Sequence, residues 1–309
     1  RNREDWIQTR ETELLPVPYF HVVFTLPEVL NKTALHEPKM LYDTLFETAW
    51  ETLQTFGKNK NLQMGMIAVL HTWGQNLSLH PHLHCIVPGG GVDENGAWKN
   101  IKNDGKFLFS VKALSKVFRA KFCEKLKANL KDKFNENQEN EYEKIRQSLW
   151  EKPWVVYAKK PFGSPKSVVE YLGRYTHKIA ISNGRIRGID DKTVTFDYKD
   201  YRQKGIKKQM VLSHEEFIRR FAMHILPKRF VKIRHYGFLS STWKRIKLKN
   251  LQQKLGIQPK EKLPPKVFQP KCSCCKVGNL VTIATFDLRG PPQWFLEMSQ
   301  NLSAPKSAF

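Results

Sequence analysis

At 309 residues the chain is long enough to bury a sizeable core, as one large domain or as two of ordinary size. Its 52 Lys and Arg residues outnumber 29 Asp and Glu residues, and the resulting net charge of +23 attracts polyanions. The sequence shows no secretory signal and no apolar run near the roughly 20 residues that span a membrane. Its five cysteines, an odd number, do not form a disulfide framework. We expect a nucleic-acid-binding protein of the cytoplasm, with no membrane partner.

The first part of the chain alternates between strand and helix patterns. After a polar lead-in, the aromatic and β-branched run 19–26 predicts a buried strand. Apolar residues recur every three or four positions over 41–56, which predicts an amphipathic helix on one face of a sheet. Residues 64–73 and 80–88 predict two strands that pair as an antiparallel hairpin.

A long helical region follows the hairpin. Residues 107–111 predict a short strand that leads into helix-forming sequence from about 114 to 150. The charged centre of that region, 131–143, predicts an insertion surrounded by solvent. Residues 154–158 predict a further strand.

Two capping boxes mark helix starts in the second half of the chain. A serine three residues before a glutamate satisfies backbone N–H groups that a helix start leaves unpaired. Ser167 with Glu170 therefore predicts one helix, and Ser213 with Glu216 predicts another. Between them, residues 179–198 predict short strands joined by Asn-Gly and Asp-Asp turns.

The C-terminal part of the chain is strongly basic. Between positions 226 and 271 the sequence holds thirteen Lys and Arg residues and the single acid Glu261. A helix is predicted over 242–255. Aromatic residues interleave with cations over 228–249, which is typical of surfaces that stack bases and bind the phosphates of a single strand. We expect Lys244 and Arg245 to contact DNA there; the alternative is a basic helix and strand that only pack.

These patterns predict an α+β fold, with a central antiparallel sheet flanked by helices and a basic α/β C-terminal extension. The predicted parts are a lead-in segment 1–18, a main domain 19–205 with the helical insertion at about 114–150, a basic DNA-binding extension 206–263, and a linker with a cysteine-containing tail 264–309.

Three of the ten histidines, His80, His82 and His84, lie within five residues of one another on a predicted strand. Side chains alternate in a strand, so the three imidazoles project from one face, roughly 7 Å apart. His82 and His84 can bind one ion when the neighbouring strand supplies a third ligand, for which His71 is preferred and Gln75 is the reserve. His80 precedes a proline, and we expect it to orient a ligand or a phosphate. The alternative is a set of ordinary polar positions on a half-exposed strand.

The composition of this site predicts the class of ion. A structural zinc site normally closes four Cys or His ligands, and Cys85 points to the opposite face from His82 and His84. Two or three protein ligands leave positions open, and open positions on a hard divalent ion suit phosphate oxygens. We therefore expect Mg²⁺ or Mn²⁺.

Tyr171 and Tyr175 stand four residues apart, so on a helix their hydroxyls share one face. A tyrosine that attacks a phosphodiester forms a phosphotyrosyl intermediate, which keeps the bond energy for rejoining. Two tyrosines allow two linked transfers; the alternative is a pair of aromatic side chains that pack on a core. The surroundings favour the first reading, because cations that can bind phosphates lie nearby in the sequence: Arg174, His177, Lys178 and Arg185.

Three of the five cysteines, Cys272, Cys274 and Cys275, crowd near the C-terminal end. No second Cys or His pair lies within the usual spacing of a zinc finger. Zinc binding and free thiols on a loop therefore both stay open for this segment.

The histidine and tyrosine motifs together resemble a known family. His-Pro-His-Leu-His at 80–84, followed by Tyr-Leu-Gly-Arg-Tyr-Thr-His at 171–177, resembles the two-tyrosine transposases of the HUH superfamily, specifically those of the rolling-circle insertion sequence 91 group of bacteria. The likeness spans residues 14–201, and a looser likeness continues through 234–237.

The resemblance implies an HUH endonuclease-like fold, with the histidine hairpin in the middle of the sheet. His82 and His84 match the two metal-ligand histidines of the family, and Tyr171 and Tyr175 match its two nucleophiles. The implied reaction cleaves and rejoins single-stranded DNA at transposon ends and target, through a 5′-phosphotyrosine and a free 3′-hydroxyl. The family usually carries a cysteine-rich zinc-binding module ahead of the catalytic part; this chain lacks it, so we expect a fragment.

Three alternatives stay open. A replication initiator or relaxase would use the same chemistry at an origin instead of transposon ends. An inactive remnant would bind single strands without forming a covalent adduct. A metal hydrolase that uses His82 and His84 would cleave without either tyrosine.

Overall fold

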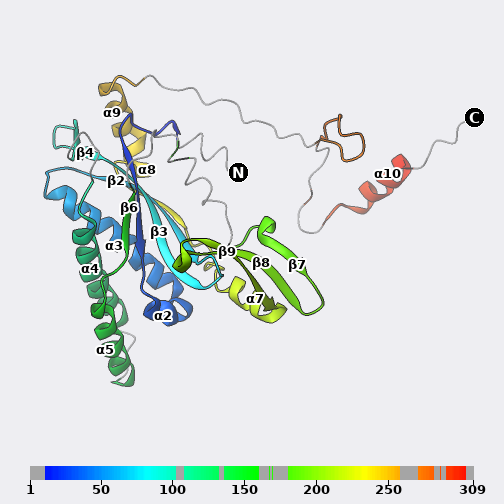
Figure 1. Cartoon of the computed structure of the whole chain (residues 1–309). Coiled ribbons are helices and arrows are strands. Elements are labelled where there is room, and N and C mark those ends of the chain that lie inside the picture. The colour runs from blue at the N-terminus through cyan, green and yellow to red at the C-terminus, as the bar shows by residue number, and fades with distance from the viewer. Residues whose placement is uncertain are drawn as a thin grey trace, which may run out of the picture. The chain divides into compact units, whose positions relative to one another are not determined.

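The computed structural model describes residues 11–101, 108–131, 136–159, 167, 169, 180–257, 271–281, 286 and 290–303 (Figure 1). The chain divides into two compact units, Arg1–Leu263 and Pro264–Phe309, and the following paragraphs describe the first unit.

A five-stranded antiparallel sheet forms the centre of the first unit, with the order β10-β2-β3-β1-β6 (Figure 1). Its strands are β1 (Tyr19–Thr25), β2 (Gly65–Trp73), β3 (Leu79–Pro88), β6 (Val156–Lys159) and β10 (Ile233–Gly237). The predicted α+β class with a central antiparallel sheet is confirmed, and so is the predicted hairpin, because β2 pairs with β3. β3 is the middle strand, so neighbours on both sides hold its backbone.

Two helices, α3 (Pro38–Lys58) and α4 (Val111–Lys131), cover one face of this sheet (Figure 1). Proline occupies the first turn of α3, where the missing N–H costs no hydrogen bond. Buried Phe24 of β1 contacts Phe118 of α4, with their ring centroids 4.9 Å apart. Aromatic pairs of this kind contribute about 0.5–1.5 kcal/mol beyond the apolar area that they bury. Cys85 belongs to the apolar core between the sheet and these helices, so it points away from His82 and His84 as predicted.

The opposite face of the sheet carries a second apolar cluster and the histidines. Ile67 and Val69 of β2 and Ile86 of β3 alternate with residues that point to the helices, as the two-residue period of a strand requires. Segments far apart in the sequence cover this face, among them the lead-in residue Leu15 and Val169. Ser167 and Val169 are both helical, in the region where the first capping box predicts a helix.

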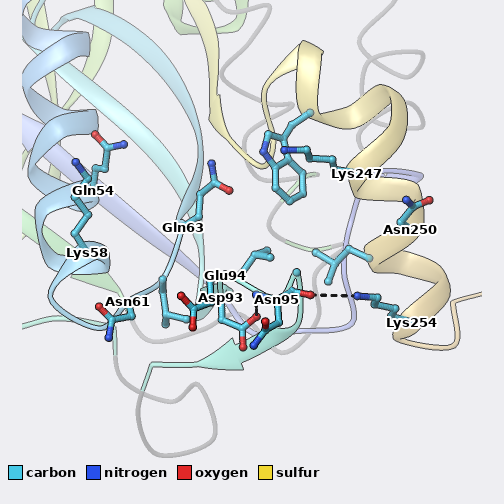
Figure 2. Close-up of a pocket in the computed structure, with 15 residues that line it drawn as sticks. Gln54, Lys58, Asn61, Gln63, Asp93, Glu94, Asn95, Lys247, Asn250 and Lys254 are labelled. Carbon is cyan, nitrogen blue, oxygen red and sulfur yellow. Dashed lines mark hydrogen bonds between the residues drawn. The ribbon is translucent and has the colours of Figure 1, made fainter.

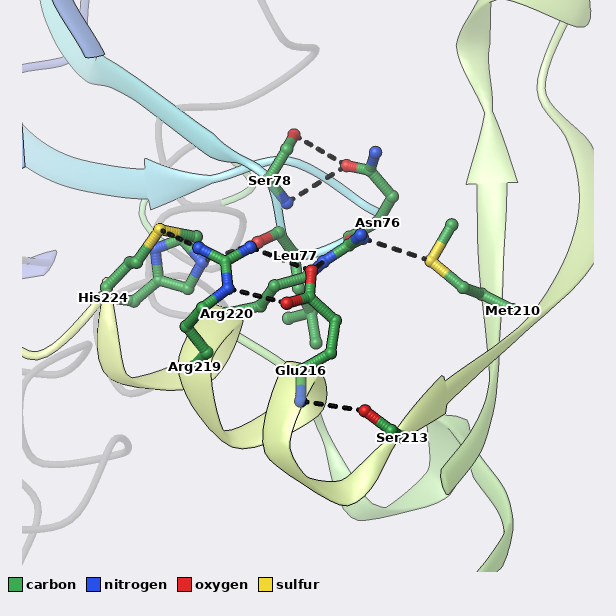
Figure 3. Close-up of polar contacts among 10 residues, drawn as sticks. Asn76, Leu77, Ser78, Met210, Ser213, Glu216, Arg219, Arg220 and His224 are labelled. Atoms are coloured by element: carbon green, nitrogen blue, oxygen red, sulfur yellow. Dashed lines mark hydrogen bonds and ion pairs between the residues drawn. The ribbon is translucent and has the colours of Figure 1, made fainter. Parts of the chain in front are cut away.

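A second antiparallel sheet consists of β7 (Ile186–Ile189), β8 (Thr193–Asp200) and β9 (Ile206–Ser213), followed by α7 (His214–Ala222). The predicted N-cap of α7 is present, because the backbone N–H of Glu216 donates to the Ser213 Oγ at 3.2 Å, while the Glu216 carboxylate pairs with Arg219 and Arg220 (Figure 3). The core of this small subdomain includes Leu77, which comes from the turn between β2 and β3. The subdomain therefore packs around the tip of the central hairpin.

The remaining described elements are short or lie outside the two sheets. They are a 3₁₀ turn at Glu28–Leu30, α2 (Asn31–His36), β4 (Gly90–Val92), β5 (Trp98–Asn100), α5 (Glu136–Glu151), 3₁₀ turns at Asn183–Arg185 and Tyr201–Gln203, α8 (Ser241–Trp243), a π-helical turn η5 (Lys244–Leu248), α9 (Lys249–Lys254) and, in the second unit, α10 (Gln293–Ser303). None of the helices in the described ranges combines the length and the apolar character needed to cross a membrane.

The strand predicted at 107–111 is wrong. Residues 108–110 form neither helix nor strand, and Val111 begins α4. Leu108 and Phe109 are buried, and Phe109 lies 5.2 Å from Phe56 of α3 between ring centroids. The apolar pattern there reflects packing against a helix and not pairing with a strand.

Gly237 ends β10 with a φ of +58°, and a Cβ on it would overlap the carbonyl oxygen of Met64. We expect Gly237→Ala to lower the free energy of unfolding by more than ~2 kcal/mol, because both the left-handed backbone and the contact oppose a side chain. Gly188→Ala is the matched control, since nothing lies within 4 Å of its added Cβ. Urea unfolding measures both; equal stability of the two variants would contradict this packing.

Candidate metal centre

Three histidines from the central hairpin converge on one point. His71 on β2 and His82 on β3 are direct cross-strand partners, and His84 follows on the same face. One ring nitrogen from each of the three lies within 4.8 Å of the others. The Nε2 atoms of His82 and His84 are 3.1 Å apart. Neighbouring ligands at about 2.1 Å from a tetrahedral or octahedral ion are roughly 3.0–3.4 Å apart, so the arrangement fits donors on a single ion.

The second ring nitrogen of His82 and that of His84 are already engaged. His82 Nδ1 lies 2.6 Å from the backbone oxygen of His80, which only accepts, so Nδ1 carries the proton and the Nε2 lone pair is exposed to the cluster. His84 Nδ1 lies 2.7 Å from the Nε2 of His21. If His84 Nδ1 donates to His21, the Nε2 atoms of His82 and His84 both present lone pairs to the same point. This tautomer is the one that a metal ligand needs.

Burial keeps these imidazoles neutral. It lowers the pKa of His82 to about 4 and the pKa of His84 well below its ordinary value, and repulsion between neighbouring imidazoles disfavours protonation further. His21 is 4% exposed, and its burial likewise lowers its pKa to about 4. Only neutral imidazole binds a metal, so the site is ready for an ion at neutral pH.

His21 on β1 contacts the histidine cluster, and the sequence did not identify it. It faces Ile86 across the β1–β3 pairing, which makes it the diagonal neighbour of His84 on the same face. Its ring stacks on that of His84, with centroids 5.0 Å apart and planes 10° apart. The one local signal is a histidine inside the apolar run 19–26, which gives no indication of its partner.

The hairpin end next to the cluster is held by further contacts. Trp73 stacks on His71, with ring centroids 4.6 Å apart, and so fixes the plane of that imidazole. His224, which follows α7, bonds the Thr72 hydroxyl through Nδ1 and the Leu77 carbonyl through Nε2, both at 3.2 Å. α7 thus connects the small subdomain to the strand that carries His71.

The predicted supporting residues of the hairpin have defined places. His80 contributes its backbone carbonyl to His82, and its ring lies 5.1 Å from the ring of His82 between centroids. Gln75, the reserve ligand, lies in the turn after β2, where its backbone carbonyl accepts a hydrogen bond from Arg185. The pairing register shifts between His71 and Trp73, which interrupts the alternation on which the reserve choice of Gln75 rested.

The predicted DNA-binding residues differ in how far they are already engaged. Arg185 donates to two backbone carbonyls, those of Gln75 and Asp197, and burial lowers its pKa. Lys244 is paired with Glu13, and its side chain is 13% exposed. Arg245 is exposed. The remaining predicted residues lie outside the described part of the chain: Tyr171, Tyr175, Arg174, His177 and Lys178.

Val169 connects this region of the sequence to the histidine face. It is fully buried and belongs to the cluster of Ile67, Val69 and Ile86, which share their sheet face with His71, His82 and His84. Val169 precedes the first predicted nucleophile by two residues.

The cysteines of the second unit lie in a tight turn. The backbone N–H of Cys272 donates to the Gly278 carbonyl at 2.7 Å, and the N–H of Gly278 donates to the Cys275 Sγ at 3.3 Å. Backbone N–H groups of Cys275 and Cys274 lower the pKa of Cys272. None of the three forms a disulfide, and zinc binding and free thiols both stay open.

The protein therefore has a central antiparallel sheet whose middle hairpin carries three histidines that could hold a metal ion. Residues 65–246, more than half of the chain, match the family model Y2_Tnp, described as "Putative transposase". The chain belongs to this transposase family. The matched range contains β2, β3 and all three clustered histidines.

Two curated relatives are also described as transposases. The chain is 40% identical over 317 aligned positions to "Putative transposase y4qJ" of Sinorhizobium fredii, an alignment that covers 94% of this chain and 79% of the relative. It is 29% identical to "Transposase for insertion sequence element IS801" of Pseudomonas savastanoi pv. phaseolicola, with 77% of this chain and 58% of that protein covered. The resemblance to insertion-sequence transposases is thereby confirmed.

Solved structures show a much looser likeness. The conjugative relaxase TrwC in complex with a mutant origin-of-transfer DNA aligns over 78% of this chain and 75% of its own, with 14% identity and a TM-score of 0.29. A metal-bound TrwC structure gives 13% identity and a TM-score of 0.28.

The His21–His84 contact yields a prediction about metal affinity. We expect His21→Leu to weaken Mn²⁺ binding by about 10–100-fold, because His84 loses the acceptor that fixes its tautomer and ring orientation. His21→Gln keeps an acceptor at a similar reach and should stay within about three-fold of the parent protein. Isothermal titration with Mn²⁺ measures both. Wild-type affinity in His21→Leu would show that the contact does not position the ligand.

Proposed function

We propose that this protein cleaves and rejoins single-stranded DNA at transposon ends by tyrosine transesterification, as a rolling-circle transposase of the HUH type. The observation that carries the proposal is the convergence of His71, His82 and His84 in a chain that also has Tyr171 and Tyr175 at helical spacing. Membership of the transposase family and the net charge of +23 support a DNA substrate.

The three histidines are proposed as the protein ligands of Mg²⁺ or Mn²⁺. Three nitrogen ligands leave positions of a six-coordinate ion available to phosphate oxygens. When bound, such an ion withdraws charge from the phosphate and makes its phosphorus more electrophilic. His21 and the His80 carbonyl orient the two β3 ligands, and Trp73 orients His71.

The tyrosines are proposed as the nucleophiles. A Tyr171 or Tyr175 oxygen forms a bond to phosphorus while the bond from phosphorus to O3′ breaks, and the proton that leaves the phenol is balanced by the one that the 3′-hydroxyl gains. The product is a 5′-phosphotyrosine and a free 3′-hydroxyl, which can reverse the reaction on a new strand. No water is consumed. The burial of Val169 on the histidine face supports this role for the residues that follow it.

The arrangement of cations supports substrate binding beside this centre. Arg174, His177 and Lys178 are proposed to bind phosphates next to the tyrosines, and exposed Arg245 to bind them on the basic extension. Arg185 and Lys244 are engaged by protein groups, so their proposed contacts with DNA would require those groups to be shared or released.

A covalent-adduct assay tests the proposal. Wild-type protein with a labelled single-stranded oligonucleotide from the element's ends and Mn²⁺ should give a complex that survives denaturing electrophoresis. We expect Tyr171→Phe with Tyr175→Phe to abolish it. His82→Ala should reduce its rate at least ~100-fold, since it removes a ligand that no neighbour replaces.

Controls separate the alternatives. Tyr157→Phe alters an exposed tyrosine of β6 and should leave the adduct unchanged. Persistence of the adduct in the double tyrosine variant would sink the assignment, and metal-dependent cleavage without an adduct would indicate a hydrolase. Binding without either reaction would indicate an inactive remnant, and preference for an origin over transposon ends would indicate an initiator or relaxase.

A further inference from the structure

Figure 2 shows a polar groove of about 860 Å³. It lies at the other end of the central hairpin from the histidines. Gln63, just before β2, lines this groove, and His71 lies eight residues further along the chain. At ~3.3 Å per residue this corresponds to about 26 Å, so the groove is separate from the proposed metal centre. Its size falls within the roughly 300–1,000 Å³ of pockets that enclose small organic groups.

Three segments of the first unit form the walls of the groove. They are the C-terminal end of α3, the turn at 93–96, and the helical run α8-η5-α9 (Figure 2). Lys254 of α9 crosses to the turn, where its Nζ donates to the Asn95 carbonyl at 3.4 Å. Lys244–Leu248 form a π-helical turn, a rare geometry that is frequent at functional sites.

The wall that presents Trp243 is firmly anchored. Leu248 and Leu251 are each 2% exposed in the cluster on the histidine face of the sheet, and Trp243 packs at the edge of that cluster. The Gln252 side chain donates to the Thr12 carbonyl at 2.9 Å, which joins α9 to the lead-in segment. The half-buried Trp243 indole is therefore already fixed in place before a ligand binds, and it offers a flat apolar surface.

The groove lining matches the chemistry of an unpaired nucleotide. Lys58, Lys247 and Lys254 are exposed cations around it, and Lys247 Nζ lies 5.1 Å from the Trp243 ring centroid. Side-chain amides supply both donors and acceptors, as base edges do: Asn61, Gln63 and Asn250. Aromatic platforms flanked by cations are the usual way to bind single strands.

The acidic residues of the groove fit a base better than a phosphate. The Asp93 carboxylate accepts from the Lys99 Nζ at 2.9 Å and from the backbone N–H groups of Asn95 and Ala97 at 3.0 and 2.9 Å, so its charge is compensated within the turn. Glu94 is exposed on the same turn. A carboxylate there can accept from the exocyclic amino group of a base, as Glu and Asp do with cytosine.

We propose that this groove binds an unpaired base of single-stranded DNA, stacked on Trp243 with its flanking phosphates on Lys58, Lys247 and Lys254. The inference rests on the proposed function for the identity of the polymer. It adds a second contact point, about 26 Å along the sheet from the metal centre, where a strand is held at a nucleotide other than the one cleaved. A duplex base cannot enter because it stays stacked and paired.

The test compares two triple variants with equal changes in charge. K58A/K247A/K254A removes the groove lysines, and K112A/K116A/K127A removes three exposed lysines of α4. We measure fluorescence anisotropy with a labelled 20-nucleotide single strand, without divalent ions and over a range of salt. The groove variant should lose at least about ten-fold in affinity, and its salt slope should fall by about two, since each phosphate contact contributes ~0.7. The α4 variant should stay within about three-fold.

Substitutions of Trp243 test stacking separately from charge. Trp243→Phe keeps an aromatic face and should bind within about three-fold of wild type, whereas Trp243→Leu should lose about ten-fold. Circular dichroism and melting temperature establish that each variant is folded, and the lysine comparison stands alone if Trp243→Leu is not. Competition with a deoxynucleoside monophosphate distinguishes a site for free nucleotides, which would displace the strand at low concentration.

Equal losses in the two lysine variants, or unchanged binding in the groove variant, would overturn the inference. These outcomes are distinct from failure of the proposed function. A wild-type protein that binds strands through the groove but forms no adduct would refute only the tyrosine chemistry. A groove variant that binds normally and forms the adduct would refute only the groove.

Discussion

The pairing of His71 with His82 across β2 and β3 is the contact on which the centre depends. Because strand side chains alternate, a slip of one residue would turn His82 and His84 toward the helices and bring Leu83 and Cys85 to the opposite face. The register is fixed by the apolar residues between the histidines. Leu83 and Cys85 are fully buried against α3 and α4, so the slipped register would bury imidazoles in their place. The same packing that stabilises the sheet therefore sets the geometry of the three histidines.

The tip of the hairpin is restrained by the β7–β9 subdomain. Leu77 has a φ of +62° and is fully buried in the core of the β7–β9 subdomain, a conformation that a branched side chain adopts only when its surroundings hold it. Arg220 of α7 donates to the Asn76 carbonyl at 3.2 Å and also pairs with Glu216 (Figure 3). His224 also bonds Thr72, and Arg185 bonds Gln75, so several side chains hold the turn. These contacts hold the end of β2, which begins at the pair next to His71 and His82, and so keep it from fraying.

Local sequence patterns are enough to predict the hairpin, the shared face of His82 and His84 and the Ser213 helix cap, because each depends on residues a few positions apart. The contribution of His21 was not predictable in this way. It arises because β1 pairs with β3 and not with β2, a choice of strand order that no single segment encodes. β10 was missed for the same reason: residues 233–237 join the edge of β2 from more than 150 positions away. In β9 only Met210 and Leu212 pack on the small core, and the polar residues 207–209 interrupt the apolar alternation by which strands are recognised.

The histidine cluster lies near one end of β2, and the groove lies at the other end. Both the histidines and the helical wall that presents Trp243 lie on the same face of the sheet, and β2 is paired on each side, by β3 and by β10. A strand held on both sides keeps its length, so the separation of the two sites does not depend on a loop. A polymer that occupied the groove would reach the histidines only by running along this face, several nucleotides further on. The fixed distance between the groove and the histidines would then determine which nucleotide is cleaved, counted from the base bound in the groove. This requires only that the DNA be single-stranded between the two points.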